Sequence, residues 1–65
     1  MLINSPKALD DAWELGYKTG WGKFKHTDPF VPPRPQSHPM GTNDASGYFY
    51  QEGYKKGVQD AQIKY

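Results

Sequence analysis

The chain has 65 residues, no cysteine, and a net charge of +1 from eight basic and seven acidic side chains. A chain of this length forms one small domain with a marginal core. The lack of cysteine excludes a disulfide scaffold and thiolate metal sites. The near-neutral charge is unlike that of a strong nonspecific nucleic-acid binder. The first residues contain neither a cationic segment nor a long apolar run, so we expect a cytoplasmic protein with no signal peptide and no membrane span.

Aromatic residues make up 15% of the chain, whereas all hydrophobic residues together make up only 35%. The core of so polar a chain has to come mainly from rings. The expected core residues are Trp13, Tyr17, Trp21, Phe24, Phe30, Tyr48, Phe49, Tyr50 and Tyr54.

A first helix is predicted from about residue 6 to about residue 22. Ser5 is a suitable N-cap, and Pro6 fits the first helical position, where its missing N–H is not needed. Apolar residues then recur at steps of three and four residues, which is the helical period. Glu14 and Lys18 are placed to form an i,i+4 ion pair.

The connector, from about residue 25 to about residue 43, holds five of the six prolines. Such a sequence cannot continue a helix and favours polyproline II or turns. The stretch PFVPPR, from Pro29 to Arg34, has the P-x-x-P-x-R spacing of a polyproline II ligand. We favour a different interpretation, in which a stiff loop packs Phe30 and Val31 over the helices.

A second helix is predicted from about residue 45 to about residue 63, with Asn43, Asp44 and Ser46 as candidate caps. Its charges form the expected i,i+4 pairs Glu52–Lys56 and Asp60–Lys64. The predicted fold is therefore all-α: a small two-helix hairpin joined by a long, proline-rich, extended loop. Pairing between two chains is a further option, because small chains without disulfides often gain stability from oligomers or partners.

The two helical segments repeat one pattern with a period of 37 residues. The equivalent positions are Trp13 and Tyr50, Gly16 and Gly53, Tyr17 and Tyr54, and Gly20 and Gly57. Each helical glycine costs about 1 kcal/mol relative to alanine, so these four need a compensating gain from close approach. The close approach is either to the other helix or to a ligand, and we favour helix packing through equivalent faces.

The pattern A-x-x-x-G-Y-x-x-G, followed by DPF and by aromatic-x-x-G-Y-x-x-G, resembles the ribosome modulation factor family and the related small ciprofloxacin-resistance-type proteins. The matching residues are Ala12, Gly16, Tyr17, Gly20, Asp28, Pro29, Phe30, Tyr50, Gly53, Tyr54 and Gly57. Family members usually have Asn-Pro-Tyr in the middle motif, Trp as the late aromatic, a shorter linker and a strongly basic composition. The resemblance implies two helices with an extended linker. It also implies binding to the bacterial 30S subunit, near the end of 16S ribosomal RNA that pairs with messenger, which silences translation.

Two kinds of residue are candidates for contact with RNA or a partner protein. The cations are Lys18, Lys23, Lys25, Arg34, Lys55 and Lys56, and the rings are Tyr17, Trp21 and Tyr54. The competing interpretation is a solvated helix face above core rings, and the lack of an obvious basic groove favours it slightly.

Nothing in the sequence indicates catalysis or a cofactor. It has no glycine-rich phosphate loop, and His26, His38 and Asp28 do not match a standard metal-ligand spacing, so we expect surface histidines. Two functions remain as hypotheses. The first is a non-catalytic protein that docks on the small ribosomal subunit and damps translation. The alternative is a small inhibitor of a host protein, of the kind that phages encode, acting through its aromatic face and proline-rich loop.

Overall fold

The computed structural model describes residues 5–36 and 44–63. It contains two packed helices, α1 (Pro6–Trp21) and α2 (Ala45–Ile63), and no strand in the described ranges. The all-α, two-helix architecture is therefore confirmed. Residues 22–36 form neither helix nor strand, and the rest of the predicted connector, with His38 and Asn43, lies outside the described residues.

Local hydrogen bonds explain where the helices begin. The Ser5 Oγ accepts from the Ala8 N–H at 3.2 Å, directly before Pro6. The carboxylate of Asp44 accepts from the Gly47 N–H at 3.0 Å, so Asp44 is the capping residue of α2 and Ser46 lies inside the helix. A side-chain acceptor at this position satisfies one of the amide groups that the first turn leaves unbonded.

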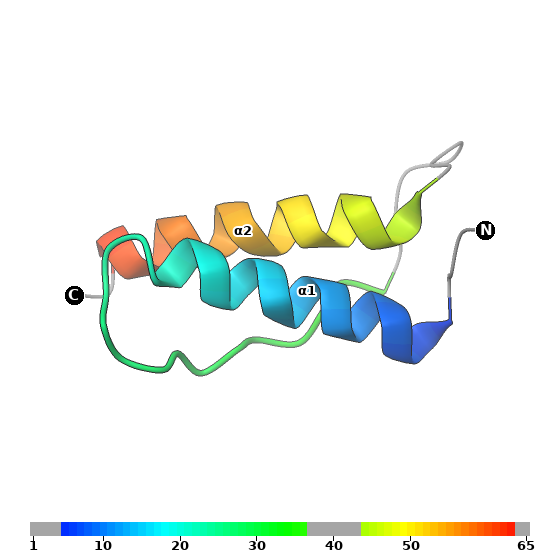
Figure 1. Ribbon diagram of the computed structural model, residues 1–65, viewed down its shortest axis with the longest axis horizontal. Helices are drawn as coiled ribbons and strands as arrows, with labels where there is room; N and C mark the ends of the chain where they lie inside the picture. Colours follow the sequence, from blue (N-terminus) through cyan, green and yellow to red (C-terminus); the bar gives the residue numbers. More distant parts are fainter. Residues whose placement is uncertain (1–4, 37–43, 64–65) are drawn as a thin grey trace.

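The two helices run in the same direction, from the N-terminal side of the molecule to the opposite end (Figure 1). The contacts agree, because the early part of α1 packs on the early part of α2, and the late parts pack together. The two helices are therefore parallel neighbours, not the antiparallel pair of a usual helical hairpin. Parallel neighbours cannot be joined by a tight turn, and the connector accordingly returns along the length of α1 (Figure 1).

The four repeat glycines lie where the helices come closest. At each of them a Cβ atom would be within 3.0 Å of a carbonyl oxygen of the opposite helix, nearer than real Cβ contacts allow. The pairs are Gly16 with Tyr50, Gly53 with Trp13, Gly20 with Tyr54, and Gly57 with Tyr17. A shift of 37 residues converts each pair into another one, so the helices are related by an approximate twofold axis parallel to them. Such close crossings also allow weak Cα–H···O hydrogen bonds.

The core consists of two clusters, one at each end of the helix pair. The first contains Leu9, Trp13, Ala45 and Phe49, and the second contains Tyr17, Trp21 and Ala61. Val31 of the connector packs against both clusters. Neither helix of the described part is long and apolar enough to cross a membrane.

The prediction of a ring-built core is wrong for two residues. Phe24 is 51% exposed and Phe30 is 90% exposed. Phe24 follows the end of α1, in the turn where the chain leaves the helix pair. Phe30 precedes Val31 in an extended segment, where neighbouring side chains point to opposite sides. Val31 takes the inward position, so Phe30 faces solvent.

Candidate functional site

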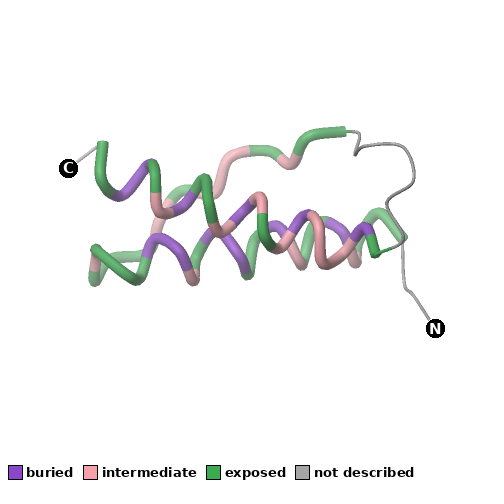
Figure 2. Tube along the Cα trace, turned by 90° about the horizontal axis from the view of Figure 1, so that it is seen from above, coloured by how far each residue is buried: buried purple, intermediate pink, exposed green. Residues whose placement is uncertain are grey.

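Residues 31–34 of the connector, which we call the strap, are bound to one side of the helix pair. Figure 2 shows this side, with the half-buried and exposed connector running beside the crossed helices. The indole Nε1–H of Trp13 donates to the Pro32 carbonyl at 2.9 Å. Together with the packing of Val31, this hydrogen bond holds the strap against α1.

Arg34 holds the other end of the strap against the two helices. Its Nε donates to the Asp10 carboxylate at 2.5 Å, and its guanidinium carbon lies 4.9 Å from the centre of the Phe49 ring. Only 12% of its side chain is exposed. The basic residue of the P-x-x-P-x-R pattern is therefore used within the chain, and so is the carbonyl of Pro32. These contacts support a packed loop in preference to a free polyproline II ligand.

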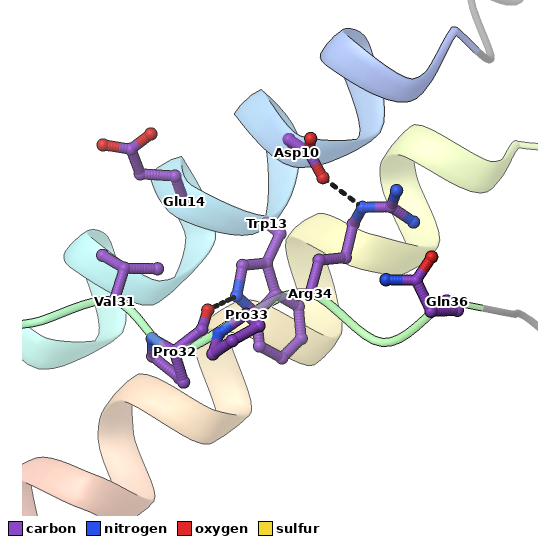
Figure 3. Close-up of a pocket in the computed structure, with 8 residues that line it drawn as sticks. All are labelled: Asp10, Trp13, Glu14, Val31, Pro32, Pro33, Arg34 and Gln36. Atoms are coloured by element: carbon purple, nitrogen blue, oxygen red, sulfur yellow. Dashed lines mark hydrogen bonds and ion pairs between the residues drawn. The ribbon is translucent and has the colours of Figure 1, made fainter.

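A pocket of about 470 Å³ lies between the strap and α1. Figure 3 shows its lining residues, which are Asp10, Trp13, Glu14, Val31, Pro32, Pro33, Arg34 and Gln36. Its charged groups already have partners, since Asp10 pairs with Arg34 and Glu14 pairs with Lys18 at 2.7 Å. The acidic side chains that line the pocket are therefore already paired with cations of the same chain.

Tyr17 and Trp21, two of the predicted stacking residues, are located in the core. They are 1% and 5% exposed, and their rings stack with centroids 6.3 Å apart. The Tyr17 hydroxyl donates to the buried Asp60 carboxylate at 2.5 Å. Burial, this hydrogen bond and the negative charge of Asp60 together hold the pKa of Tyr17 well above its ordinary value. Neither ring has a face open to a base in this structure.

Most of the predicted cations are compensated by neighbouring acids. Lys18 pairs with Glu14, and this hydrogen bond and charge raise the pKa of Lys18. Lys55 pairs with Glu52 at 3.4 Å and Lys56 with Asp60 at 3.5 Å. The expected Glu52–Lys56 pair is thus replaced by two others, because Asp60 attracts Lys56. Lys64, the partner expected for Asp60, lies outside the described residues.

The segment from residue 23 to residue 30, which we call the 23–30 segment, differs from the rest of the surface. Lys23 is exposed and forms no ion pair within the described ranges, and Lys25 is half-buried. Phe24 and Phe30 expose their rings, and His26 and Asp28 are also exposed. Cations therefore alternate with open rings over a short stretch that includes the DPF motif.

Comparisons with protein-family models, with curated proteins and with solved structures found no match.

The family resemblance consequently depends on its motifs alone. The structure gives these motifs different surroundings: the Gly-Tyr pairs lie at the helix interface, with Tyr17 buried and Tyr54 half-buried, whereas Phe30 of DPF is open to solvent. The described residues contain no group of three or more His, Cys, Asp or Glu side chains able to hold a metal ion.

Two features of the site were not found from the sequence. Phe24 and Phe30 were assigned to the core, although their position beside prolines and turn residues indicates a surface segment. From the sequence, Asp60 is predicted only to pair with Lys64, and its burial is not predicted. Its position three residues after Gly57, toward the face that packs on α1, was the available signal of burial.

Proposed function

We propose that this chain is a non-catalytic binding protein that docks on RNA of the bacterial small ribosomal subunit and lowers translation. The supporting observation is the 23–30 segment, where the exposed rings of Phe24 and Phe30 alternate with Lys23, Lys25 and His26. Stacking rings combined with cations are the usual means of binding unpaired nucleotides. The DPF motif in this segment is also part of the family resemblance.

The proposal assigns the contacts differently from the sequence prediction. Tyr17 and Trp21 serve the core, and the stacking role passes to Phe24 and Phe30. Lys23 and Lys25 are the cations nearest to these rings in sequence. Lys55 and Lys56 contribute less, because each already pairs with an acid of α2.

Co-sedimentation with purified 30S subunits in a low-salt sucrose gradient tests the proposal. We expect the chain to sediment with the subunits, and Phe30→Ser to weaken binding by one to two orders of magnitude, since one stacked base contributes about 1–3 kcal/mol. Leu15→Ser is the matched control, because Leu15 is also an exposed hydrophobic residue, at 59%, but lies on α1. A chain that stays at the top of the gradient contradicts ribosome docking.

Lysine substitutions test the electrostatic part. Lys23→Ala removes one phosphate contact, so the slope of log affinity against log salt becomes shallower by about 1. Lys7→Ala is the control, because Lys7 is exposed at the far end of α1 and pairs with Asp11. Equal slopes for both variants would exclude Lys23 from the RNA contact.

Inhibition of a host protein is the second candidate, and the compensated charges favour it. Lys18, Lys55 and Lys56 are paired to acids, and among residues 5–36 and 44–63 the most exposed large apolar side chain is Phe30. Affinity capture from a bacterial lysate separates the two functions. A single stoichiometric protein that remains bound after nuclease and high salt supports the inhibitor, whereas capture that is lost under these conditions supports RNA docking.

A further inference from the structure

The strap and the residue after it have the composition of a polyproline II segment, with Pro32, Pro33 and Pro35 in four positions. Each proline fixes its own φ angle, and the residue before a proline is restricted to the extended region. A polyproline II segment forms no internal hydrogen bonds. Its carbonyl groups therefore need a donor from elsewhere, and the Pro32 carbonyl obtains one from Trp13.

Three residues of the helix pair, Asp10, Trp13 and Phe49, bind the strap, and we call them the receiving face. The Trp13 indole donates to a strap carbonyl at 2.9 Å. The Asp10 carboxylate accepts from the Arg34 Nε at 2.5 Å, and the Phe49 ring lies 4.9 Å from the guanidinium carbon. Aromatic grooves that bind P-x-x-P segments use the same kinds of contact, because such segments arrive already extended with their carbonyls unpaired.

The receiving face is built by the helices and not by the segment that occupies it. Asp10 and Trp13 are three residues apart on α1, so they lie on one side of that helix. Trp13 and Phe49 belong to the first core cluster, together with Leu9 and Ala45, and they are 6% and 0% exposed. The packing of α1 on α2 thus fixes both rings.

The strap itself is held by contacts near the surface. The Asp10 side chain that binds Arg34 is 62% exposed, and exposed ion pairs contribute little to stability. Val31 is only half-buried. The pocket of about 470 Å³ separates part of the strap from α1, and both Asp10 and Trp13 line it (Figure 3). An incoming segment therefore has access to two residues of the receiving face while the strap is still in place.

We propose that the receiving face is a recognition site for proline-rich segments that carry an arginine, and that such a segment of a partner protein replaces the strap. The partner's arginine binds Asp10 above the Phe49 ring, and a carbonyl of its backbone accepts from Trp13. A second copy of this chain carries the same sequence, but there both ends of the strap continue into the connector between two packed helices. The site does not use the rings of Phe24 and Phe30, so it does not depend on ribosome docking.

An NMR titration of the full chain with a weakened strap tests the proposal. Val31→Ser and Arg34→Ala together remove two contacts of the strap and leave the receiving face unchanged. We expect the indole N–H signal of Trp13 to move toward the position of an indole bonded to water. A blocked synthetic peptide, DPFVPPRPQ, has the sequence of residues 28–36. It should return this signal toward its position in the unmodified chain, with a dissociation constant of about 1 mM.

A charge reversal tests the arginine contact. The peptide with Arg34→Glu should bind the weakened chain about two- to fivefold less tightly, as for loss of an exposed ion pair. Asp10→Lys in the chain should reverse this preference. Asp11→Lys is the matched control, because Asp11 is 61% exposed, pairs with Lys7 and does not line the pocket. It should leave the preference unchanged.

The unmodified chain provides a second measurement, which does not require the weakened chain to fold. A segment tethered within its own chain has an effective concentration on the order of 1 mM. Peptide at about 10 mM should therefore displace the strap and shift the signals of Trp13 and Val31 together.

Three results would overturn the proposal. The first is the absence of any peptide-dependent change of the Trp13 signal in both chains. The second is a peptide preference that Asp10→Lys does not reverse, or that Asp11→Lys alters to the same extent. The third is recovery of the Trp13 signal of the weakened chain on addition of unmodified chain but not of peptide, which would assign the site to a second copy.

Discussion

Replacement of Gly57 by alanine separates helix propensity from helix packing as the source of stability. In an isolated helix, alanine is more favourable than glycine by about 1 kcal/mol. In the folded chain, the new Cβ would contact the Tyr17 carbonyl oxygen and lie 2.9 Å from the Trp21 nitrogen. Both are backbone atoms, so the contact can be relieved only by separating the helices.

The expected loss follows from this separation. An ordinary Cβ contact begins at 3.4 Å, so the helices have to move apart by about 1 Å. A gap of that size removes about a quarter to a half of the dispersion energy of the atoms that face it, and overpacking of this kind costs about 1–3 kcal/mol. After subtraction of the propensity gain of about 1 kcal/mol, we expect a net loss of up to about 2 kcal/mol. This corresponds to a fall of up to about 15 °C in Tm for a domain of this size.

Thermal unfolding followed by circular dichroism measures this change. Gly22→Ala is the control, because Gly22 has φ of −66°, which alanine adopts readily, and its nearest atom is the Lys18 oxygen at 3.3 Å. Gly20→Ala should behave like Gly57→Ala, since Gly20 faces the Tyr54 carbonyl in the equivalent way. A Tm for Gly57→Ala above that of the unmodified chain would refute the packing argument.

The remaining predictions concern polar contacts. Tyr17→Phe removes the hydrogen bond to Asp60 and should lower the free energy of unfolding in urea by about 1–3 kcal/mol. The folded pKa of Tyr17 is raised above the unfolded value of about 10. The contribution of Tyr17 to the free energy of unfolding is therefore complete below about pH 10 and is lost as the pH rises toward the folded pKa. If the stability of the Tyr17→Phe variant fell with alkaline pH as steeply as that of the unmodified chain, this reasoning would be contradicted. Arg34→Ala should loosen the strap, shift Trp13 fluorescence to longer wavelength and increase its quenching by acrylamide, and unchanged emission would count against the strap contact. Ser5→Ala should lower stability by about 1 kcal/mol through loss of the α1 cap, again measured by thermal unfolding.

Both helices and the faces through which they pack could be predicted, because the capping residues and the glycine repeat indicated the same two helices. Ser5 and Pro6 signal the start of one helix, and Asp44 signals the start of the other. The energetic cost of Gly16 and its three equivalents required a close contact, and the structure places that contact between the helices.

The arrangement around the helix pair was less predictable, because it depends on where the connector lies. Tyr17 and Tyr54 occupy equivalent repeat positions, yet one is buried and the other half-buried, since the strap covers only one side of the helix pair. The choice of Val31 over Phe30 as the inward residue depends on a register set by the Trp13–Pro32 hydrogen bond. The sequence of neither helix contains that information.

The parallel direction of the helices has a consequence for how the chain folds. The glycine contacts between them join residues 34 to 40 positions apart, as in Gly16–Tyr50 and Tyr17–Gly57, and the Tyr17–Asp60 hydrogen bond joins residues 43 positions apart. Each of these separations is more than half of a 65-residue chain. Helical proteins with contacts this distant in sequence lose the speed that local contacts confer. The strap contacts close shorter loops, with sequence separations of 19 for Trp13 and Pro32 and 24 for Asp10 and Arg34. Shorter loops cost less entropy to close, so we expect the strap to dock on α1 first and to bring Ala45 back to the end of α1 where α2 has to begin.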